Sequence, residues 1–235
     1  MSPVGVTCLV ELTEVNLDVA IDPAFGGQGR SADNLNAAHG VAIVAHPHPL
    51  FGGARDNKVV MTLARALTSR GFHVLRPNFR GVGGSTGLFD EGQGESQDLL
   101  DLHRMCAGLR QPAWWPEGPE FLWPKTSNRL LAGFSFGAFV QTLVAQKITG
   151  DIPLLILVGL AVSRFPASEV REGTLVIHGE LDDVVPLVDV LNWARPMAQP
   201  VIVIPGAGHF FHGHLLGLKG ILSDYLIARY NTDSL

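Results

Sequence analysis

Short apolar runs recur along most of this chain and alternate with longer segments of helical period. The runs are VAIVA (41–45), HVLRP (73–77), RLLAG (129–133), LLILV (154–158), TLVIHG (174–179) and VIVIP (201–205). Such near-continuous apolar runs are typical of strands that are buried on both faces of a parallel sheet. Apolar residues at helical spacing occupy the segments 58–71, 94–110, 136–150 and 211–230. The alternation predicts an α/β fold built of βαβ units, with a mostly parallel central sheet and helices on both faces.

Two segments depart from this alternation. Residues 6–22, VTCLVELTEVNLDVAID, alternate in character and predict one or two antiparallel strands at the edge of the sheet. Residues 111–128 contain four prolines and four large aromatic residues, so they are too rich in proline to form a helix. This segment is expected to be either a loop packed by its own aromatic side chains or a partial wall or lid of the functional site.

The size and composition of the chain indicate one globular unit. Of its 235 residues, 46% are hydrophobic and 17% are charged, so the chain can bury a full core. We therefore expect a single α/β domain over residues 1–235. The formal net charge of −5 and the lack of any basic run argue against a nucleic-acid partner.

Nothing in the sequence predicts a membrane or secreted protein. Cys8 and Cys106 form no disulfide framework or C-x-x-C pair, which fits a reducing compartment. The N-terminus lacks the basic region and the continuous apolar stretch of a signal peptide. The longest apolar run, IPLLILVGLAV, is too short to span a bilayer. A soluble cytoplasmic protein is therefore expected.

The strand run RLLAG leads directly into GFSFG, residues 133–137, and then into a segment of helical period. This is a G-x-S-x-G motif in the strand–turn–helix context that the motif requires. The glycines leave room for the strand and the helix to approach each other. The serine at the apex of the strained turn is exposed above a helix N-terminus, which favours developing negative charge. Ser135 is therefore the predicted nucleophile.

A serine hydroxyl is a weak nucleophile and needs a base, which an acid must in turn orient. In this architecture the chain order is serine, acid, histidine. Acidic residues follow the run TLVIHG and a histidine follows VIVIP, and open α/β sheets place their sites at such carboxyl ends of strands. We predict Asp182 as the acid and His209 as the base. Asp183 and Glu180 remain alternatives for the acid.

Four further polar residues are interpreted as non-catalytic. His178, at a strand end, is expected to be a structural hydrogen-bonding residue. His212 and His214 are expected in the first turn of a helix, solvated or locally bonded. Ser85, in GVGGSTG, lacks the strand–turn–helix context of a nucleophile.

No metal or cofactor site is predicted. His46 and His48, in HPHPLFGG, form an H-x-H pair after a strand, but the Asp-His pair of a metallo-hydrolase does not follow. The histidine cluster that begins at His209 has no carboxylate or cysteine at ligand spacing. GVGGSTG is not a G-x-G-x-x-G nucleotide motif, because Thr86 breaks the pattern at its last glycine.

Five segments carry a resemblance to a known superfamily. They are HPHPLFGGARDNKVV, RPNFRGVGGSTGLFDEGQGE, AGFSFGA, HGELDDVVP and GAGHFFHG, and they cover most of the chain from about residue 40 onward. On these motifs the chain resembles the α/β-hydrolases, and among them the small dienelactone-hydrolase-like bacterial serine hydrolases and esterases with no cap domain. The resemblance implies Asp182, the fifth residue of HGELD, as the acid and His209 as the base. Pro77, where an aromatic is usual, and the long segment 111–128 depart from the pattern and concern the shape of the pocket.

The resemblance also implies how an oxyanion hole is built. One donor is the backbone N–H of the residue after the nucleophile, Phe136, and the loop after strand 41–45 supplies the second. The prolines on either side of His48 have no N–H, which leaves His48 and Leu50 as donors. The superfamily's H-G-x pattern selects His48. The His46 imidazole is expected to brace this loop, so neither histidine is the base.

Together these features predict two-step hydrolysis of a small-molecule carboxylic ester through an acyl-Ser135 intermediate, with no cofactor. Residues 161–173 stand where larger relatives insert a cap domain. Without a cap the site is expected to be open and shallow and to accept small or short acyl groups. The alternatives are a peptidase or thioesterase with the same triad, and a non-enzymatic binding module. Whether the chain forms a homodimer is left open.

Overall fold

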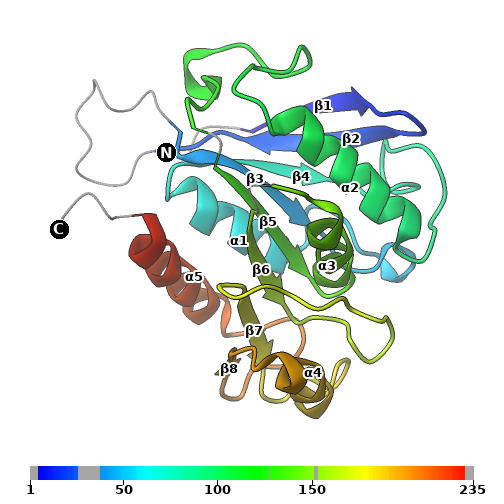
Figure 1. The fold of residues 1–235 in the computed structure, drawn as a ribbon, viewed down its shortest axis with the longest axis vertical. Coiled ribbons are helices and arrows are strands. Elements are labelled where there is room, and N and C mark those ends of the chain that lie inside the picture. Colours follow the sequence, from blue (N-terminus) through cyan, green and yellow to red (C-terminus); the bar gives the residue numbers. More distant parts are fainter. Residues whose placement is uncertain (1–4, 26–37, 127, 151–152, 231–235) are drawn as a thin grey trace.

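Eight strands form one sheet in the part of the chain that the computed structural model describes, residues 5–25, 38–126, 128–150 and 153–230 (Figure 1). They are β1 (Val6–Glu11), β2 (Asn16–Asp22), β3 (Gly40–Ala45), β4 (Phe72–Pro77), β5 (Arg129–Phe134), β6 (Leu154–Val158), β7 (Leu175–Gly179) and β8 (Val201–Ile204). Their order across the sheet is β1-β2-β4-β3-β5-β6-β7-β8.

The sheet is mostly parallel, as the sequence predicts. β3 to β8 run parallel to one another, whereas β2 pairs antiparallel with both β1 and β4. The strands β3 to β7 are buried along their whole length, which explains their continuous apolar sequences. The prediction of antiparallel strands from residues 6–22 is confirmed by the pair β1 and β2 at one edge.

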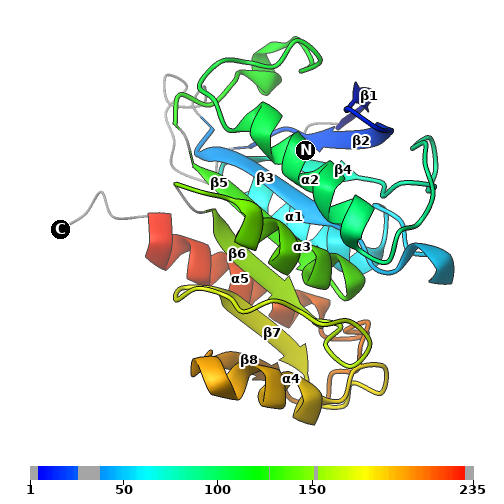
Figure 2. The ribbon, with the colours of Figure 1, turned by 45° about the vertical axis from the view of Figure 1, so that its right-hand side comes forward.

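Helices cover both faces of the sheet (Figure 2). The helices are α1 (Lys58–Thr68), α2 (Gln93–Cys106), α3 (Phe136–Lys147), α4 (Leu187–Ala194) and α5 (Leu215–Tyr230). α2 and α3 pack with each other on one face, and α1 and α5 pack with each other on the other. Two apolar clusters form the core, one under each helix pair. The predicted α/β-hydrolase architecture is therefore confirmed.

Three details of the helices differ from the prediction. α5 begins at Leu215 rather than at residue 211, because Phe211 (φ 53°) and Gly213 (φ 77°) have left-handed backbone conformations that a helix cannot contain. His212 and His214 therefore lie in the turn before the helix. α2 ends at Cys106 and α3 at Lys147, each a few residues early. The short helix α4 was not predicted, because its eight residues give too little periodic signal.

In its described residues, 111–126 and 128, the segment 111–128 is a loop packed by its own aromatic side chains, with one short 3-10 helix at Pro119–Phe121. Trp115 is buried, donates its indole N–H to the carbonyl of Phe121 over 2.6 Å, and meets the Trp123 ring edge-on at 4.8 Å. The loop joins the end of α2 to the start of β5, so it lies at the amino ends of the parallel strands (Figure 1). The alternative that it forms a wall or lid of the site is wrong.

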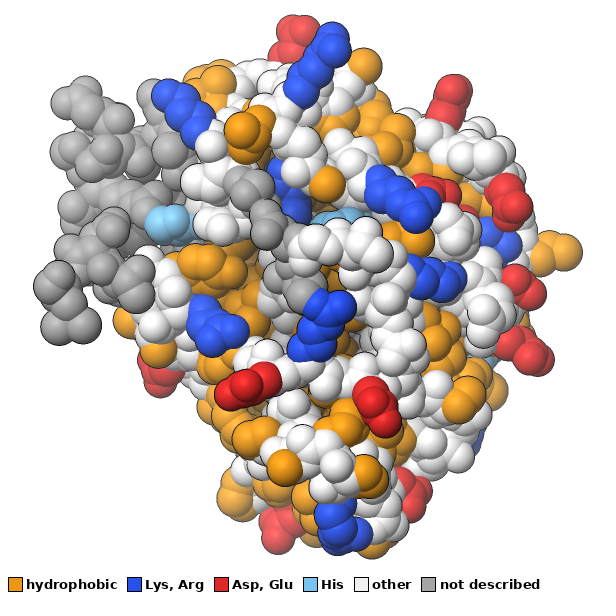
Figure 3. Space-filling model, in the orientation of Figure 1, with side chains coloured by type: hydrophobic (Ala, Val, Ile, Leu, Met, Phe, Trp, Pro, Cys, Tyr) orange, Lys and Arg blue, Asp and Glu red, His pale blue; other side chains and the backbone are white. Residues whose placement is uncertain are grey.

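The loop between β6 and β7, residues 159–174, contains neither a helix nor a strand, so no cap domain is inserted there. None of the described helices is both long and apolar enough to cross a membrane. On the face drawn in Figure 3, Lys and Arg side chains are spread among acidic and apolar ones rather than gathered into one basic surface.

Candidate active site

Ser135 occupies the sharp turn between β5 and α3. Its backbone angles, φ 56° and ψ −118°, lie in a sparsely populated region, which is the strained geometry expected of the G-x-S-x-G turn. A Cβ on Gly133 would lie 2.4 Å from the carbonyl carbon of Gly137, and one on Gly137 would lie 2.5 Å from the carbonyl oxygen of Ala45. Both positions therefore require glycine, and the close packing lifts the Ser135 hydroxyl above the end of the sheet.

The loops after β7 and β8 bring the predicted acid and base to this serine. His209 Nε2 lies 2.9 Å from Ser135 Oγ, and His209 Nδ1 lies 2.7 Å from Asp182 Oδ2. All three residues are buried. Because a carboxylate only accepts hydrogen bonds, Asp182 selects the tautomer of His209 with the proton on Nδ1. Nε2 is then free to accept the Ser135 proton, which is the requirement for activating a serine hydroxyl.

The environment of Asp182 keeps its carboxylate ionised. Its Oδ1 accepts hydrogen bonds from the backbone N–H groups of Val184 (3.0 Å) and Val185 (2.7 Å). Burial acts to raise the pKa of Asp182, but the hydrogen bonds from His209 and Val185 outweigh it and hold that pKa below its ordinary value. The alternative Asp183 is exposed and makes none of these contacts. The side chain of Glu180 instead accepts from the backbone N–H of Gly206.

His46 braces the loop after β3. Its Nδ1 lies 2.6 Å from the carbonyl of Pro47 and its Nε2 accepts from the backbone N–H of Phe79 over 2.9 Å. Burial lowers the pKa of His46 to about 4, even though the bond to Pro47 acts to raise it. Both ring nitrogens are thus engaged in a neutral, buried imidazole, which confirms the bracing role that the sequence predicts.

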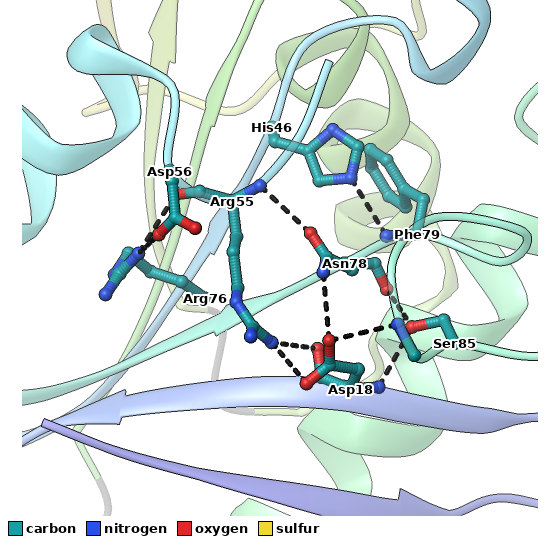
Figure 4. Close-up of polar contacts among 9 residues, drawn as sticks. Asp18, His46, Arg55, Asp56, Arg76, Asn78, Phe79 and Ser85 are labelled. Carbon is teal, nitrogen blue, oxygen red and sulfur yellow. Dashed lines mark hydrogen bonds and ion pairs between the residues drawn. The ribbon is translucent and has the colours of Figure 1, made fainter. Parts of the chain in front are cut away.

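A polar network that involves β2 and the loop after β4 anchors the loop after β3 (Figure 4). The backbone N–H of Arg55 donates to Asn78 Oδ1 over 3.0 Å, and its guanidinium donates to the carbonyl and the carboxylate of Asp18 on β2. Asn78 also donates to the Asp18 carboxylate over 3.1 Å. Ser85 donates to the Asn78 carbonyl and accepts from the Asp18 N–H, so its hydroxyl is structural. The antiparallel strand pair therefore holds the loop that carries His48.

The His48 imidazole does not reach the triad. Its Nδ1 accepts from the backbone N–H of Leu50 over 3.2 Å. The centroid of its ring lies 4.7 to 5.7 Å from the ring centroids of four phenylalanines, Phe51, Phe89, Phe136 and Phe165. Leu50, the other candidate oxyanion donor, thus has its N–H engaged. Phe136 is the first residue of α3, so its N–H has no partner within the helix.

His212 and His214 lie outside the hydrogen-bonded chain of Ser135, His209 and Asp182. His212 is exposed and stacks on Phe210. Among the described residues, no three His, Cys, Asp or Glu side chains come together as metal ligands.

Comparison with known proteins places this geometry in a family. Residues 30–198 match the X-Pro dipeptidyl-peptidase (S15) family, which is well over half of the chain. The chain belongs to this family. It is 32% identical to an α/β serine hydrolase without a lid from Xanthomonas campestris, over 96% of this chain and 94% of that one, with a TM-score of 0.75. The resemblance to cap-less α/β-hydrolases is therefore confirmed.

Two further proteins are similar to this S15-family chain, one in sequence and one in fold. It is 30% identical over 214 residues to an uncharacterized protein of Rickettsia prowazekii, covering 86% of this chain and 84% of that protein. A dienelactone hydrolase from Anabaena variabilis shares its fold, with a TM-score of 0.68 at 17% identity over 97% of this chain and 99% of that one. The S15 family match and the 32% identical serine hydrolase show that the chain is a hydrolase of the α/β superfamily.

The hydrolase has a cavity of about 380 Å³ beside Ser135 and His209. Its lining is mainly aromatic and aliphatic, and comprises Pro47, His48, Phe51, Gly52, Gly53, Asn57, Ser135, Phe136, Ala161, Arg164, Phe165, Val184, Val185, His209 and Phe210. A larger hollow of about 870 Å³ lies at the amino ends of β5 and β6 and contains none of the triad residues. The smaller cavity is the one that a substrate of Ser135 would occupy.

Sequence reasoning missed two features of this site. Arg164 and Phe165 line the cavity from the loop after β6, and no local motif marks them. His178 is a hydrogen-bonding residue, as predicted, since its Nε2 lies 2.9 Å from the Val185 carbonyl, but its approach to within 3.4 Å of Asp182 Oδ2 was not foreseen. The sequence feature that could have indicated this contact is the position of His178 at the end of a strand, four residues before Asp182.

Proposed function

We propose that Ser135, His209 and Asp182 form the catalytic triad of a serine hydrolase that cleaves carboxylic esters of small or short-chain acids. The observation that carries the proposal is the continuous hydrogen-bonded chain from the Ser135 hydroxyl through His209 to the Asp182 carboxylate. The open cavity, which no cap covers, supports a small substrate.

The reaction has two steps. His209 Nε2 takes the Ser135 proton as the oxygen attacks the ester carbonyl, and the resulting imidazolium then gives that proton to the departing alcohol. In the second step His209 takes a proton from a water molecule as that water attacks the acyl-serine carbonyl. The imidazolium then returns the proton to Ser135 Oγ as its bond to the acyl carbon breaks, and the carboxylic acid is released. Asp182 holds the imidazole and stabilises its positive charge in both steps.

The negative charge on the carbonyl oxygen requires donors placed in advance. We assign the backbone N–H groups of His48 and Phe136 to this role. Both residues line the cavity with Ser135, and the bond from Leu50 to the His48 ring removes the competing donor. The bracing of the loop by His46 and Arg55 supports a fixed donor position.

The family match favours a peptidase as the second candidate function. An enzyme that releases dipeptides has to recognise the free ammonium group of its substrate close to the scissile bond, and a carboxylate is the natural partner for that charge. Among the described residues, the cavity lining contains no Asp or Glu, and its one permanently charged side chain is the cation Arg164. This observation favours an ester over an X-Pro peptide.

A substrate panel distinguishes these candidates. We expect the wild-type protein to hydrolyse 4-nitrophenyl acetate and butyrate with higher kcat/KM than the decanoate. Its rate with each of these esters is expected to be far above that of Ser135→Ala. Gly-Pro-4-nitroanilide and a butyryl thioester are the comparison substrates. A kcat/KM for the anilide above that for the acetate would replace the esterase by a peptidase, and a preference for the thioester would replace it by a thioesterase.

Substitutions of His48 test the backbone donor. His48→Ala keeps the N–H and is expected to lower kcat by less than about tenfold, whereas His48→Pro deletes the N–H and is expected to cost roughly 10²- to 10³-fold. Circular dichroism of each variant checks the fold. If His48→Ala folds normally and is as inactive as His209→Ala, the imidazole itself takes part in the chemistry and the assignment is wrong.

A further inference from the structure

His178 lies in β7 behind the acid of the proposed triad. Its imidazole is completely buried, and its Nε2 lies 2.9 Å from the carbonyl oxygen of Val185 and 3.4 Å from Asp182 Oδ2. The same Oδ2 receives His209 Nδ1 at 2.7 Å. Two imidazoles thus approach one carboxylate oxygen. His209 belongs to the proposed triad, whereas His178 takes no part in the proton transfers.

The contacts of His178 fix its tautomer. A carbonyl oxygen can only accept, so Nε2 carries the proton and faces both Val185 and Asp182. Nδ1 is then a bare acceptor, and within the described residues it has no hydrogen-bond partner. Burial lowers the pKa of His178, although the Val185 bond and the Asp182 charge act to raise it, so the imidazole stays neutral.

An unpartnered buried acceptor costs stability, and an apolar side chain of similar size at this position would avoid that cost. The advantage of histidine here is therefore the N–H on its other side. That N–H donates to the Val185 carbonyl at one end of the turn 182–185, and its nitrogen lies 3.4 Å from the Asp182 carboxylate at the other end, an electrostatic contact without a hydrogen bond. Val185 in turn donates its own N–H to Asp182 Oδ1 over 2.7 Å, so the three residues form a closed unit.

We infer that His178 is a positioning residue, whose Nε2–H holds the Asp182 carboxylate and its turn in the orientation that aligns His209. This inference rests on the proposed function, because it assigns His178 a part in the same reaction. The titratable groups that face His178 are Asp182 and His209, from the loops after β7 and β8. A neutral N–H beside the carboxylate disperses part of its charge and so moderates how strongly Asp182 stabilises the His209 imidazolium.

The test compares His178→Leu with His178→Gln, whose amide N–H can replace Nε2–H. We expect His178→Leu to lower kcat for 4-nitrophenyl butyrate about three- to tenfold with KM nearly unchanged. When the N–H is absent, the full charge of the Asp182 carboxylate stabilises the His209 imidazolium more strongly. The acidic limb of the plot of kcat/KM against pH is therefore expected to move to higher pH. His178→Gln is expected to restore most of kcat and the original limb.

A double variant shows whether His178 acts through Asp182. In the Asp182→Asn background, His178→Leu is expected to add little further loss, because the group that it positions is already gone. Equal losses in both backgrounds would overturn the inference. So would a wild-type kcat and pH profile in His178→Leu, or, if the leucine variant does not fold, in His178→Asn, whose shorter amide cannot reach Asp182 as Nε2–H does. Failure of the proposed function looks different, since wild-type enzyme would then not hydrolyse the ester at all.

Discussion

Ser135→Ala is expected to lower kcat for 4-nitrophenyl butyrate by roughly 10⁴- to 10⁶-fold, because removing the nucleophile of a triad abolishes the contribution of all its members. The Ser135 hydroxyl lies 2.9 Å from His209 Nε2 at a strained turn that no other described serine occupies. Alanine fits the same turn, so the fold and the thermal midpoint are expected to change little. Initial rates at saturating ester, with circular dichroism of the purified variant, are the measurement.

Ser163→Ala is the matched control. Ser163 is exposed on the loop after β6, and its hydroxyl bonds Asp189 rather than any triad residue. We expect this variant to keep kcat within about twofold, since surface substitutions of this kind change little. A Ser135→Ala enzyme that retains more than a tenth of the wild-type rate would remove Ser135 from the mechanism.

Asp182→Asn is expected to cost on the order of 10⁴-fold in kcat, because an asparagine amide can donate to His209 and so stabilise the wrong tautomer of the imidazole. The substitution is nearly isosteric, and the backbone N–H groups of Val184 and Val185 still find an acceptor if the amide oxygen faces them. The loss should therefore appear in kcat, with KM and the fold retained.

Asp183→Asn provides the comparison at the adjacent position. Its side chain is exposed and does not contact His209, so we expect a loss below about threefold. Rates measured on both variants with the same ester decide the register. A severe loss in Asp183→Asn together with a mild one in Asp182→Asn would make Asp183 the acid.

The sequence was most informative where local backbone geometry restricts which residues fit. The turn at Ser135 needs glycine at 133 and 137 because a Cβ there would clash, so the motif is visible in the sequence. That an acidic residue after β7 and His209 after β8 would meet Ser135 followed from a general property of parallel sheets, whose carboxyl ends meet at one edge, whereas the resemblance selected Asp182 among the acidic residues. These features rest on short-range sterics and strand direction, which a single sequence carries.

Features that depend on packing between distant segments could not be predicted. The pairing of Asp18 with Arg55 joins residues from β2 and from the loop after β3, and no local pattern marks either residue. The start of α5 depends on the left-handed backbone of Phe211, which aromatic side chains rarely adopt. The position of the 111–128 loop in the fold depends on where α2 ends. The composition of the loop alone fits both a lid over the site and a loop far from it.

The central claim is that Ser135 is the nucleophile of an acyl-enzyme reaction, and covalent labelling tests it most directly. Wild-type protein is treated with a fluorophosphonate, digested, and analysed by mass spectrometry, with Ser135→Ala in parallel. We expect one adduct per chain, on the peptide that contains Ser135, together with complete loss of esterase activity. No labelling of active wild-type protein, or an adduct on another serine that persists in Ser135→Ala, would contradict the account.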